Sequence, residues 1–312
     1  MKRIAFLFAC VLSACAPTFE GGGQGSMTPV LAEDAFITPD GLRLPLRRWE
    51  AKQPRAIVVA LHGMSDYSNA FDMPGRDWAE HGITTIAYDQ RGFGAGPNPG
   101  VWQGSDAMRR DLRDAVEAAH ARYPGLPVYA LGESMGGAVV LSSLATPDAP
   151  RVDGVILVAP AVWSRADMPL LYRGALFVAA HLMPGLVLSN NAAHRVVTIV
   201  PSDNIPMLRA LARDPLFQKR TRSDTVYGLV NLMDEARNAP KQIKTAPPIL
   251  FLYGKKDQVI PAAPTQAVAK ELGNKADVRL YENGYHMLLR DLQAAKVWRD
   301  AADWMLATKP GS

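Results

Sequence analysis

Short, largely apolar runs recur along the chain, and they constrain its fold more than any other feature. Three of them cover residues 56–61, 83–88 and 127–131. Runs of this length and character are typical of strands buried on both faces, as in a parallel sheet. Further strands are expected at 154–159, 248–253 and 277–281, and an alternating one at 42–46. The sequence therefore predicts a central, mostly parallel sheet.

Helical segments between these runs complete an α/β pattern. Ser105 is a favourable N-cap residue, and the apolar residues that follow it at 108, 112, 115, 116 and 119 fall on one helical face. That face should pack on the sheet. Strands that alternate with helices favour a parallel sheet covered by helices on both faces, and we assign residues 31–160 and 241–312 to this core.

Residues 161–240 break the alternation of strands and helices. They contain apolar stretches and several prolines, and we interpret them as a helical lid inserted into the core. A transmembrane helix over 170–188 is the alternative. Arg173, His181 and the helix-breaking Pro184 interrupt that stretch, which favours the lid.

The first residues have the pattern of a targeting signal. Lys2 and Arg3 precede an apolar stretch over 4–12 that is too short to span a bilayer. The stretch ends in Leu12-Ser13-Ala14-Cys15, which resembles the lipobox of bacterial lipoproteins. We expect residues 1–14 to be the signal peptide and Cys15 to become the lipidated first residue. An ordinary secretory signal with an incidental cysteine is the alternative.

The expected processing sets the compartment and the charge. Residues 15–30 include a glycine-rich stretch and would form a lipidated, flexible tether to the membrane. Ala16 stands where an aspartate would resemble an inner-membrane retention signal, which favours the outer membrane, facing the periplasm. No intramolecular disulfide is expected, because at most one cysteine remains. Without Lys2 and Arg3, 32 basic residues oppose 30 acidic ones, so nothing suggests nucleic-acid binding. The oligomeric state stays open.

The motif with the clearest chemical meaning is Gly132-Glu133-Ser134-Met135-Gly136, a G-x-S-x-G pentapeptide between a predicted strand and a predicted helix. A tight, strained turn at this junction would project the hydroxyl of Ser134. Small neighbours let adjacent backbone pass close by, and the N-terminus of the following helix favours negative charge. Ser134 is therefore the candidate nucleophile.

A nucleophilic serine needs a base and a carboxylate that orients the base. Asp257 follows the strand at 248–253, and His286 lies in a loop after the last strand. The order Ser, Asp, His along the chain is that of the hydrolases with this turn. We predict a Ser134, Asp257 and His286 triad, with Glu133 and Glu282 as substitutes for Asp257.

Backbone amides that stabilise an oxyanion are expected from two places. Met64 follows His62-Gly63 at the end of the strand 56–61, and Met135 follows the nucleophile. Both methionine side chains would then lie at the site, where their flexibility tolerates varied acyl chains. We interpret His62 as a structural residue that fixes its loop. Arg91 is expected to hold backbone carbonyls.

Together these motifs resemble the α/β-hydrolase superfamily and, more narrowly, monoacylglycerol lipases and lysophospholipase-like serine hydrolases. The resemblance covers residues 31–312 and rests on His62-Gly63, Asp89-Gln90-Arg91-Gly92-Phe93-Gly94, the Ser134 pentapeptide with Gly137, Asp257 with Pro261, and Gly284-Tyr285-His286. It implies a lid inserted between two late strands. The loop after Gly63 lacks the glutamate-histidine pair frequent in monoacylglycerol lipases, which leaves the glycerol head group open.

The expected function is hydrolysis of carboxylic esters, such as monoacylglycerols or lysophospholipids, through an acyl-enzyme on Ser134. No cofactor and no metal are expected. An aminopeptidase-like hydrolase is one alternative, and a non-catalytic envelope lipoprotein is another. An aminopeptidase would need acidic residues in the insertion to hold an α-amine, and candidates for this role include Asp203, Asp214, Asp224, Asp234 and Glu235.

Overall fold

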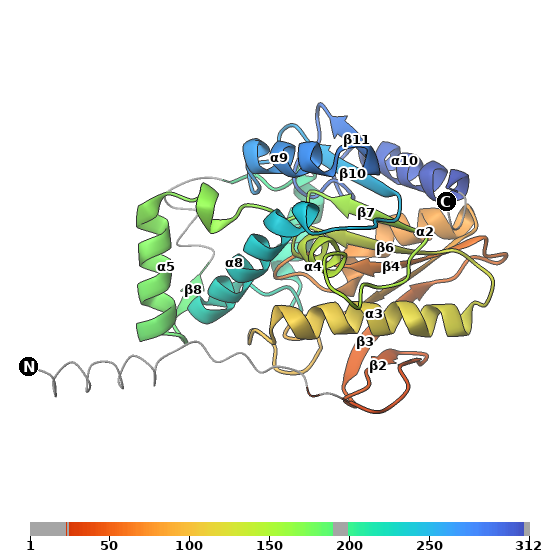
Figure 1. Ribbon diagram of the computed structural model, residues 1–312, viewed down its shortest axis with the longest axis horizontal. Helices are drawn as coiled ribbons and strands as arrows, with labels where there is room; N and C mark the ends of the chain where they lie inside the picture. The colour runs from red at the N-terminus through yellow and green to blue at the C-terminus, as the bar shows by residue number, and fades with distance from the viewer. Residues whose placement is uncertain (1–22, 24, 190–198, 309–312) are drawn as a thin grey trace, which may run out of the picture.

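A nine-stranded sheet forms the centre of the computed structural model, which describes residues 23, 25–189 and 199–308 (Figure 1). The neighbouring strands β5, β4, β6, β7, β10 and β11 pair in parallel, and antiparallel pairs join β1, β2, β3 and β5 at the other edge. This confirms the predicted mostly parallel sheet. In spatial order the strands are β1 (Val30–Leu31), β2 (Ala35–Ile37), β3 (Arg43–Trp49), β5 (Ile83–Tyr88), β4 (Ala56–Leu61), β6 (Val128–Glu133), β7 (Gly154–Val158), β10 (Ile249–Gly254) and β11 (Ala276–Tyr281).

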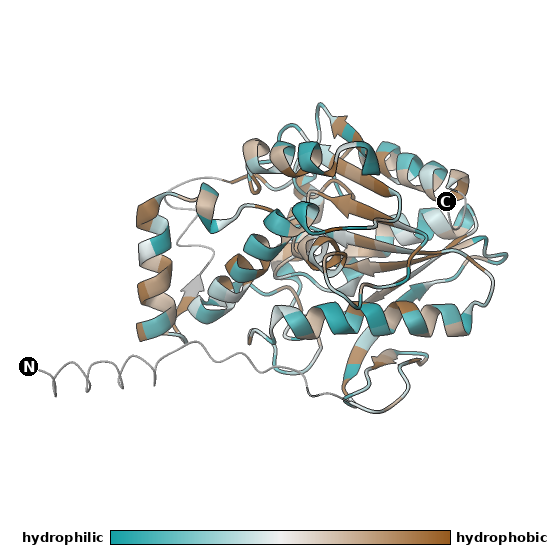
Figure 2. Ribbon diagram, viewed as in Figure 1, coloured by the Kyte–Doolittle hydropathy of each residue, from teal (hydrophilic) through white to brown (hydrophobic). Residues whose placement is uncertain are grey.

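Helices cover both faces of the sheet. On one face lie α3 (Ser105–Arg122), α4 (Met135–Ser143) and α9 (Ala262–Leu272), and on the other lie α2 (Asp72–Glu80) and α10 (Ala294–Ala307). Alternate residues of β4 enter the two cores, so every position of this strand is buried. Figure 2 shows the resulting apolar strands at the centre. The two-sided packing explains why the runs read as uninterrupted apolar stretches.

The strand β6 extends two residues beyond the predicted end at 131. Gly132 and Glu133 pair with Leu157 and Val158 of β7, which brings the end of the strand directly to Ser134. A smaller difference concerns α3. Ser105 is its first residue rather than its N-cap, because Gly104 occupies the N-cap position with a φ of 90°.

The insertion (residues 161–240) lies between β7 and β10 and mixes helices with a small antiparallel sheet of two strands. The helices agree with the predicted helical insertion, and the two strands were not predicted. No helix in the part of the chain that the structure describes is long and apolar enough to cross a membrane. The main elements of the insertion are α5 (Leu170–Leu182), β8 (Val187–Ser189), α7 (Ile205–Arg213), β9 (Arg220–Arg222) and α8 (Ser223–Asn238), and α8 packs against α4 and α5.

The N-terminal edge of the core begins before the predicted boundary. The amide of Met27 donates to the carbonyl of Pro39 (3.2 Å), and β1 starts at Val30. The end of the predicted tether over 15–30 therefore belongs to the fold. The predicted signal peptide over 1–14 and Cys15 lie outside the described residues.

Arg91 anchors this edge through carboxylates rather than carbonyls. Its guanidinium donates to Asp40 (2.8 Å) in the turn before β3 and to Asp111 (2.6 Å) on α3. The prediction that Arg91 holds backbone carbonyls was therefore wrong. A buried guanidinium needs opposite charge, and its planar fork matches a carboxylate.

Candidate active site

Ser134 stands in a strained turn between β6 and α4. Its φ of 53° and ψ of −113° are rare for a residue with a side chain. The turn fits only because the flanking glycines lack side chains: a Cβ on Gly132 would lie 2.3 Å from the carbonyl oxygen of Gly136, and a Cβ on Gly136 would lie 2.1 Å from that of Leu61. The amide of Ser134 donates to the carbonyl of Val158 (2.9 Å) and ties the turn to β7.

The three residues predicted as a triad form one hydrogen-bonded chain. His286 Nε2 lies 2.9 Å from Ser134 Oγ, and His286 Nδ1 lies 2.8 Å from Asp257 Oδ2. The other oxygen of Asp257 accepts the amides of Val259 (2.7 Å) and Ile260 (3.0 Å), and the carboxylate is fully buried. Because Asp257 accepts the Nδ1 proton, the Nε2 lone pair faces the serine.

The two predicted oxyanion donors flank this serine. Met135 is the first residue of α4, so its amide has no acceptor within the helix. Met64 follows Gly63, whose added Cβ would lie only 3.2 Å from Cβ of Ser134. The loop after β4 therefore runs close to Ser134, and Met64 lines the same cavity as this serine.

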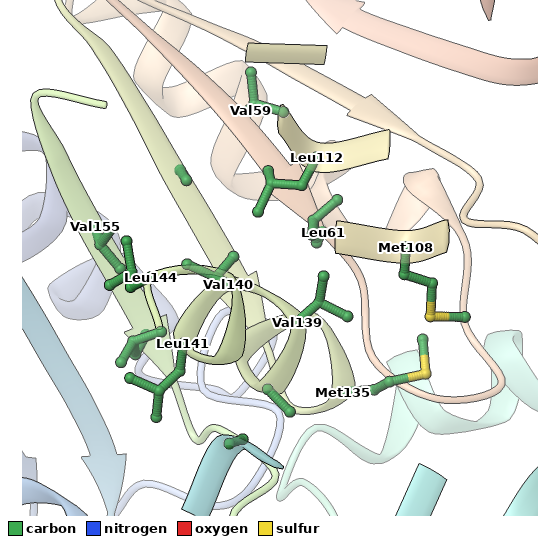
Figure 3. Packing of buried hydrophobic residues seen from close by; sticks show 14 of the residues in the cluster. Val59, Leu61, Met108, Leu112, Met135, Val139, Val140, Leu141, Leu144 and Val155 are labelled. Atoms are coloured by element: carbon green, nitrogen blue, oxygen red, sulfur yellow. The ribbon is translucent and has the colours of Figure 1, made fainter. Parts of the chain in front are cut away.

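The side chain of Met135 departs from the prediction. It is fully buried in the core with Met108 and Val139 (Figure 3), so it cannot contact an acyl chain. The expectation that both methionines face the substrate was wrong for Met135, because its place at the start of α4 turns the side chain into the sheet–helix core. Met64 alone of the two lines the cavity.

His62 holds the loop after β4 in place. Its Nδ1 donates to the carbonyl of Gly63 (2.9 Å), and its Nε2 accepts the amide of Gln90 (2.9 Å). Complete burial lowers the pKa of His62. A neutral ring with both nitrogens engaged agrees with the structural role inferred from the sequence.

A cavity of about 540 Å³ opens over Ser134 and His286. Most of its lining is apolar, and most of the apolar residues come from the insertion, in particular from α7 and the residues just before it. The polar lining residues are Ser134, His286 and Ser65, together with a buried charged group formed by Asp66, Glu133 and Arg290. The apolar lining residues are Met64, Ile199, Val200, Pro201, Ile205, Leu208, Leu211, Ala212, Phe217, Val259 and Met287.

The charged group in the cavity wall was not predicted. Arg290 lies 2.6 Å from Asp66 Oδ2 and donates to Glu133 Oε2 at 3.3 Å, and all three side chains are buried. Burial also raises the pKa of Glu133. Glu133 is therefore engaged by Arg290, and the exposed Glu282 pairs with Lys255, so the structure places neither substitute carboxylate against His286.

The five acidic residues of the insertion named above are all engaged elsewhere, and a sixth, Asp167, accepts the hydroxyl of Ser164 (2.6 Å). None of the six lines the cavity. Among residues 25–189 and 199–308, no three His, Cys, Asp or Glu side chains are grouped as metal ligands would be. Asp203 accepts the amide of Leu292, Asp214 accepts the hydroxyl of Tyr67, and Asp224, Asp234 and Glu235 pair with Arg222, Arg165 and Arg109.

The parallel sheet, the strained serine turn and the insertion over the carboxyl ends of the strands define an α/β-hydrolase. Comparison with known proteins places the chain within this class. The profile of the hydrolase family described as "Serine aminopeptidase, S33" matches residues 52–293, and the chain belongs to this family.

Individual relatives agree with the resemblance read from the motifs. Human monoglyceride lipase is 26% identical over 261 residues, which cover 82% of this chain and 84% of the human protein. The monoacylglycerol lipase of Mycolicibacterium smegmatis is 23% identical over 281 residues, covering 88% and 97% of the two chains. The crystal structure of Paleococcus ferrophilus monoacylglycerol lipase superposes with a TM-score of 0.70 at 21% identity, over 85% of this chain and 99% of that one. The predicted resemblance to monoacylglycerol lipases is confirmed.

Proposed function

We propose that this protein is a serine ester hydrolase that cleaves acyl esters such as monoacylglycerols or lysophospholipids through an acyl-enzyme on Ser134. The observation that carries the proposal is the hydrogen-bonded chain from Ser134 through His286 to the buried Asp257 at the base of an apolar cavity. The names of the relatives, monoglyceride and monoacylglycerol lipases, support the same substrate class.

The geometry supports acyl transfer in two halves. His286 Nε2 takes the proton of Ser134 Oγ as this oxygen attacks the ester carbonyl, and the protonated ring then gives the proton to the leaving alcohol. Asp257 remains ionised and stabilises the imidazolium. Water next attacks the acyl-enzyme with His286 again as base, which releases the carboxylic acid and restores Ser134.

Charge that develops on the carbonyl oxygen would be held by the amides of Met64 and Met135. One such donor typically contributes about 10²- to 10³-fold in kcat. The N-terminus of α4 adds its positive end to the same position. These groups are backbone amides, so the oxyanion site depends on the positions of the two turns rather than on side-chain identity.

The cavity wall favours an apolar acyl group over an amino-acid residue. The family description names an aminopeptidase. An α-amine would need a free carboxylate near the nucleophile, yet all six acidic residues of the insertion, Asp167 included, have other partners and stand outside the cavity lining. Within the cavity, Asp66 and Glu133 share Arg290. We therefore favour ester hydrolysis over peptide hydrolysis.

A substrate panel tests this function. The purified protein is assayed with p-nitrophenyl esters from acetyl to palmitoyl and with amino-acid p-nitroanilides, beside the Ser134→Ala variant. We expect the wild type to hydrolyse the esters and the Ser134→Ala variant to hydrolyse none of them. Faster turnover of anilides than of esters would establish the aminopeptidase alternative, and no turnover of any substrate would favour a non-catalytic envelope lipoprotein.

We also propose that lipidation of Cys15 holds the enzyme at the bacterial envelope, facing the periplasm from the outer membrane. The lipobox-like sequence motivates the proposal, and α5 adds a largely exposed apolar surface on which Leu170 and Leu171 are each 77% exposed. Expression in a bacterium and separation of membranes tests it. The wild type should sediment with outer membranes, whereas Cys15→Ala should be released. Equal release of both proteins would contradict the anchor.

A further inference from the structure

The loop that carries His286 is fastened to the insertion on both sides of the histidine. On one side, the amide of Tyr285 donates to Asp291 Oδ2 (2.7 Å), and Asp291 Oδ1 accepts the hydroxyl of Ser202 (2.6 Å). On the other side, the amide of Met287 donates to the carbonyl of Pro201 (2.9 Å). Two residues of the insertion thus hold the peptide units next to the general base.

These contacts are protected from water. Ser202 is fully buried and Asp291 is 2% exposed. Buried hydrogen bonds to a carboxylate are strong, and loss of one partner leaves a polar group unsatisfied. The carboxylate of Asp291 therefore fixes the spacing between Tyr285 and Ser202.

The same segment continues into the wall of the cavity. Ser202 Oγ accepts the amide of Asn204 (3.1 Å), and the side chain of Asn204 donates to the carbonyl of Arg290 (2.8 Å). The next residue, Ile205, begins α7 and lines the cavity. The position of the α7 wall and the position of His286 are consequently set by one hydrogen-bonded unit.

We propose that Asp291, together with Ser202, is a positioning residue that aligns His286 with Ser134. The inference rests on the proposed role of His286 as general base. His286 must keep its bonds to Ser134 (2.9 Å) and Asp257 (2.8 Å) at the same time. A shift of about 1 Å in such an arrangement costs on the order of 10²-fold in rate.

Four variants test the proposal in the full-length protein with one ester substrate. Asp291→Ala removes both acceptors, whereas Asp291→Asn retains an acceptor for Tyr285 and can donate to Ser202. Ser202→Ala removes one bond only. The matched control is Asp203→Ala, because Asp203 is adjacent in sequence to Ser202 but its side chain accepts the amide of Leu292 and bonds to neither Tyr285 nor Met287.

Asp291→Ala should lower kcat by about 10- to 100-fold with KM within about twofold of wild type, and should slow fluorophosphonate labelling of Ser134 by a similar factor. Asp291→Asn should recover most of kcat, Ser202→Ala should lose about 3- to 10-fold, and Asp203→Ala should match wild type. Wild-type kcat in a folded Asp291→Ala protein would overturn the proposal, as would equal losses in Asp291→Ala and Asp203→Ala.

Ser202→Ala decides the case in which Asp291→Ala does not fold: a lower kcat at unchanged KM supports the positioning role, and an unchanged kcat contradicts it. His286→Ala separates this inference from the proposed function. If the function itself fails, His286→Ala equals wild type. If only the positioning role fails, His286→Ala loses activity while the Asp291 and Ser202 variants keep it.

Discussion

Gly136 lies directly against the backbone of Leu61, so that a methyl group at Gly136 would come within 2.1 Å of the Leu61 carbonyl oxygen. Neither backbone can move without displacing β4 or the start of α4. Gly136→Ala should lower the free energy of unfolding by about 3 kcal/mol, measured by urea denaturation.

Gly174→Ala on α5 is the matched control, because an added Cβ there meets nothing within 4 Å. This substitution should be neutral or stabilise by up to about 1 kcal/mol, since alanine is the better helix former. Similar destabilisation in both variants would argue against a tight elbow at Gly136.

Asp257→Asn should preserve the fold and lower kcat by about 10³- to 10⁴-fold. The amide keeps the size of the carboxylate but offers its NH2 or its oxygen to His286 Nδ1 without stabilising the imidazolium. The backbone amides of Val259 and Ile260 favour the oxygen on their own side, which leaves the NH2 facing the ring. Steady-state kinetics check this expectation, with Glu282→Gln as the control. A greater loss of kcat in Glu282→Gln than in Asp257→Asn would indicate that Glu282, and not Asp257, is the carboxylate of the triad.

The apolar wall of α7 should set the accepted acyl length. Leu208 lines the cavity, and Leu208→Trp would fill part of its volume. We expect kcat/KM for a decanoyl ester to fall by about 10-fold or more while that for an acetyl ester changes little. Leu292→Trp is the control, because Leu292 is 72% exposed and outside the cavity lining. A uniform loss across acyl lengths would place the acyl chain elsewhere.

The free energy of unfolding should depend on the ionisation of Asp291 between pH 4 and pH 7. Burial raises the pKa of Asp291 to about 6, and the nearby carboxylates of Asp203 and Glu133 act in the same direction. In the unfolded chain the pKa returns to its ordinary value of 3.8. Between these values the folded protein binds a proton that the unfolded chain lacks, so the contribution of this group to stability falls as pH rises.

Asp291→Asn has no proton to lose and isolates this effect. The free energy of unfolding of the wild type minus that of Asp291→Asn should decrease from pH 4 to pH 7 by up to about 3 kcal/mol. Urea denaturation of both proteins across this range provides the measurement. A constant difference, or one that grows with pH, would contradict the raised pKa.

The sheet could be predicted from the sequence because a strand that is buried on both faces is a continuous, largely apolar run of residues. The strands β4 and β5 coincide with the predicted runs, since every residue of both strands is buried. The glycines of the serine turn gave a second local signal. The relative positions of Ser134, Asp257 and His286 followed from the order of strands, because parallel strands end at the same edge.

Features that depend on contacts between residues far apart in the sequence have no such local pattern and were not predicted. Arg290 gave no signal, since only the fold brings it to Asp66 and Glu133. The direction of the Met135 side chain depends on the packing of α4 and not on its place beside Ser134. The antiparallel strands β1 and β2 are two and three residues long, too short for a period to be recognised.

The most direct test of the central claim is the site of covalent labelling by a fluorophosphonate, read by mass spectrometry of the digested protein. We expect one adduct, on Ser134, which is absent from Ser134→Ala and forms at least about 100-fold more slowly in His286→Ala. An adduct on another residue, or equal labelling of wild type and Ser134→Ala, would contradict it.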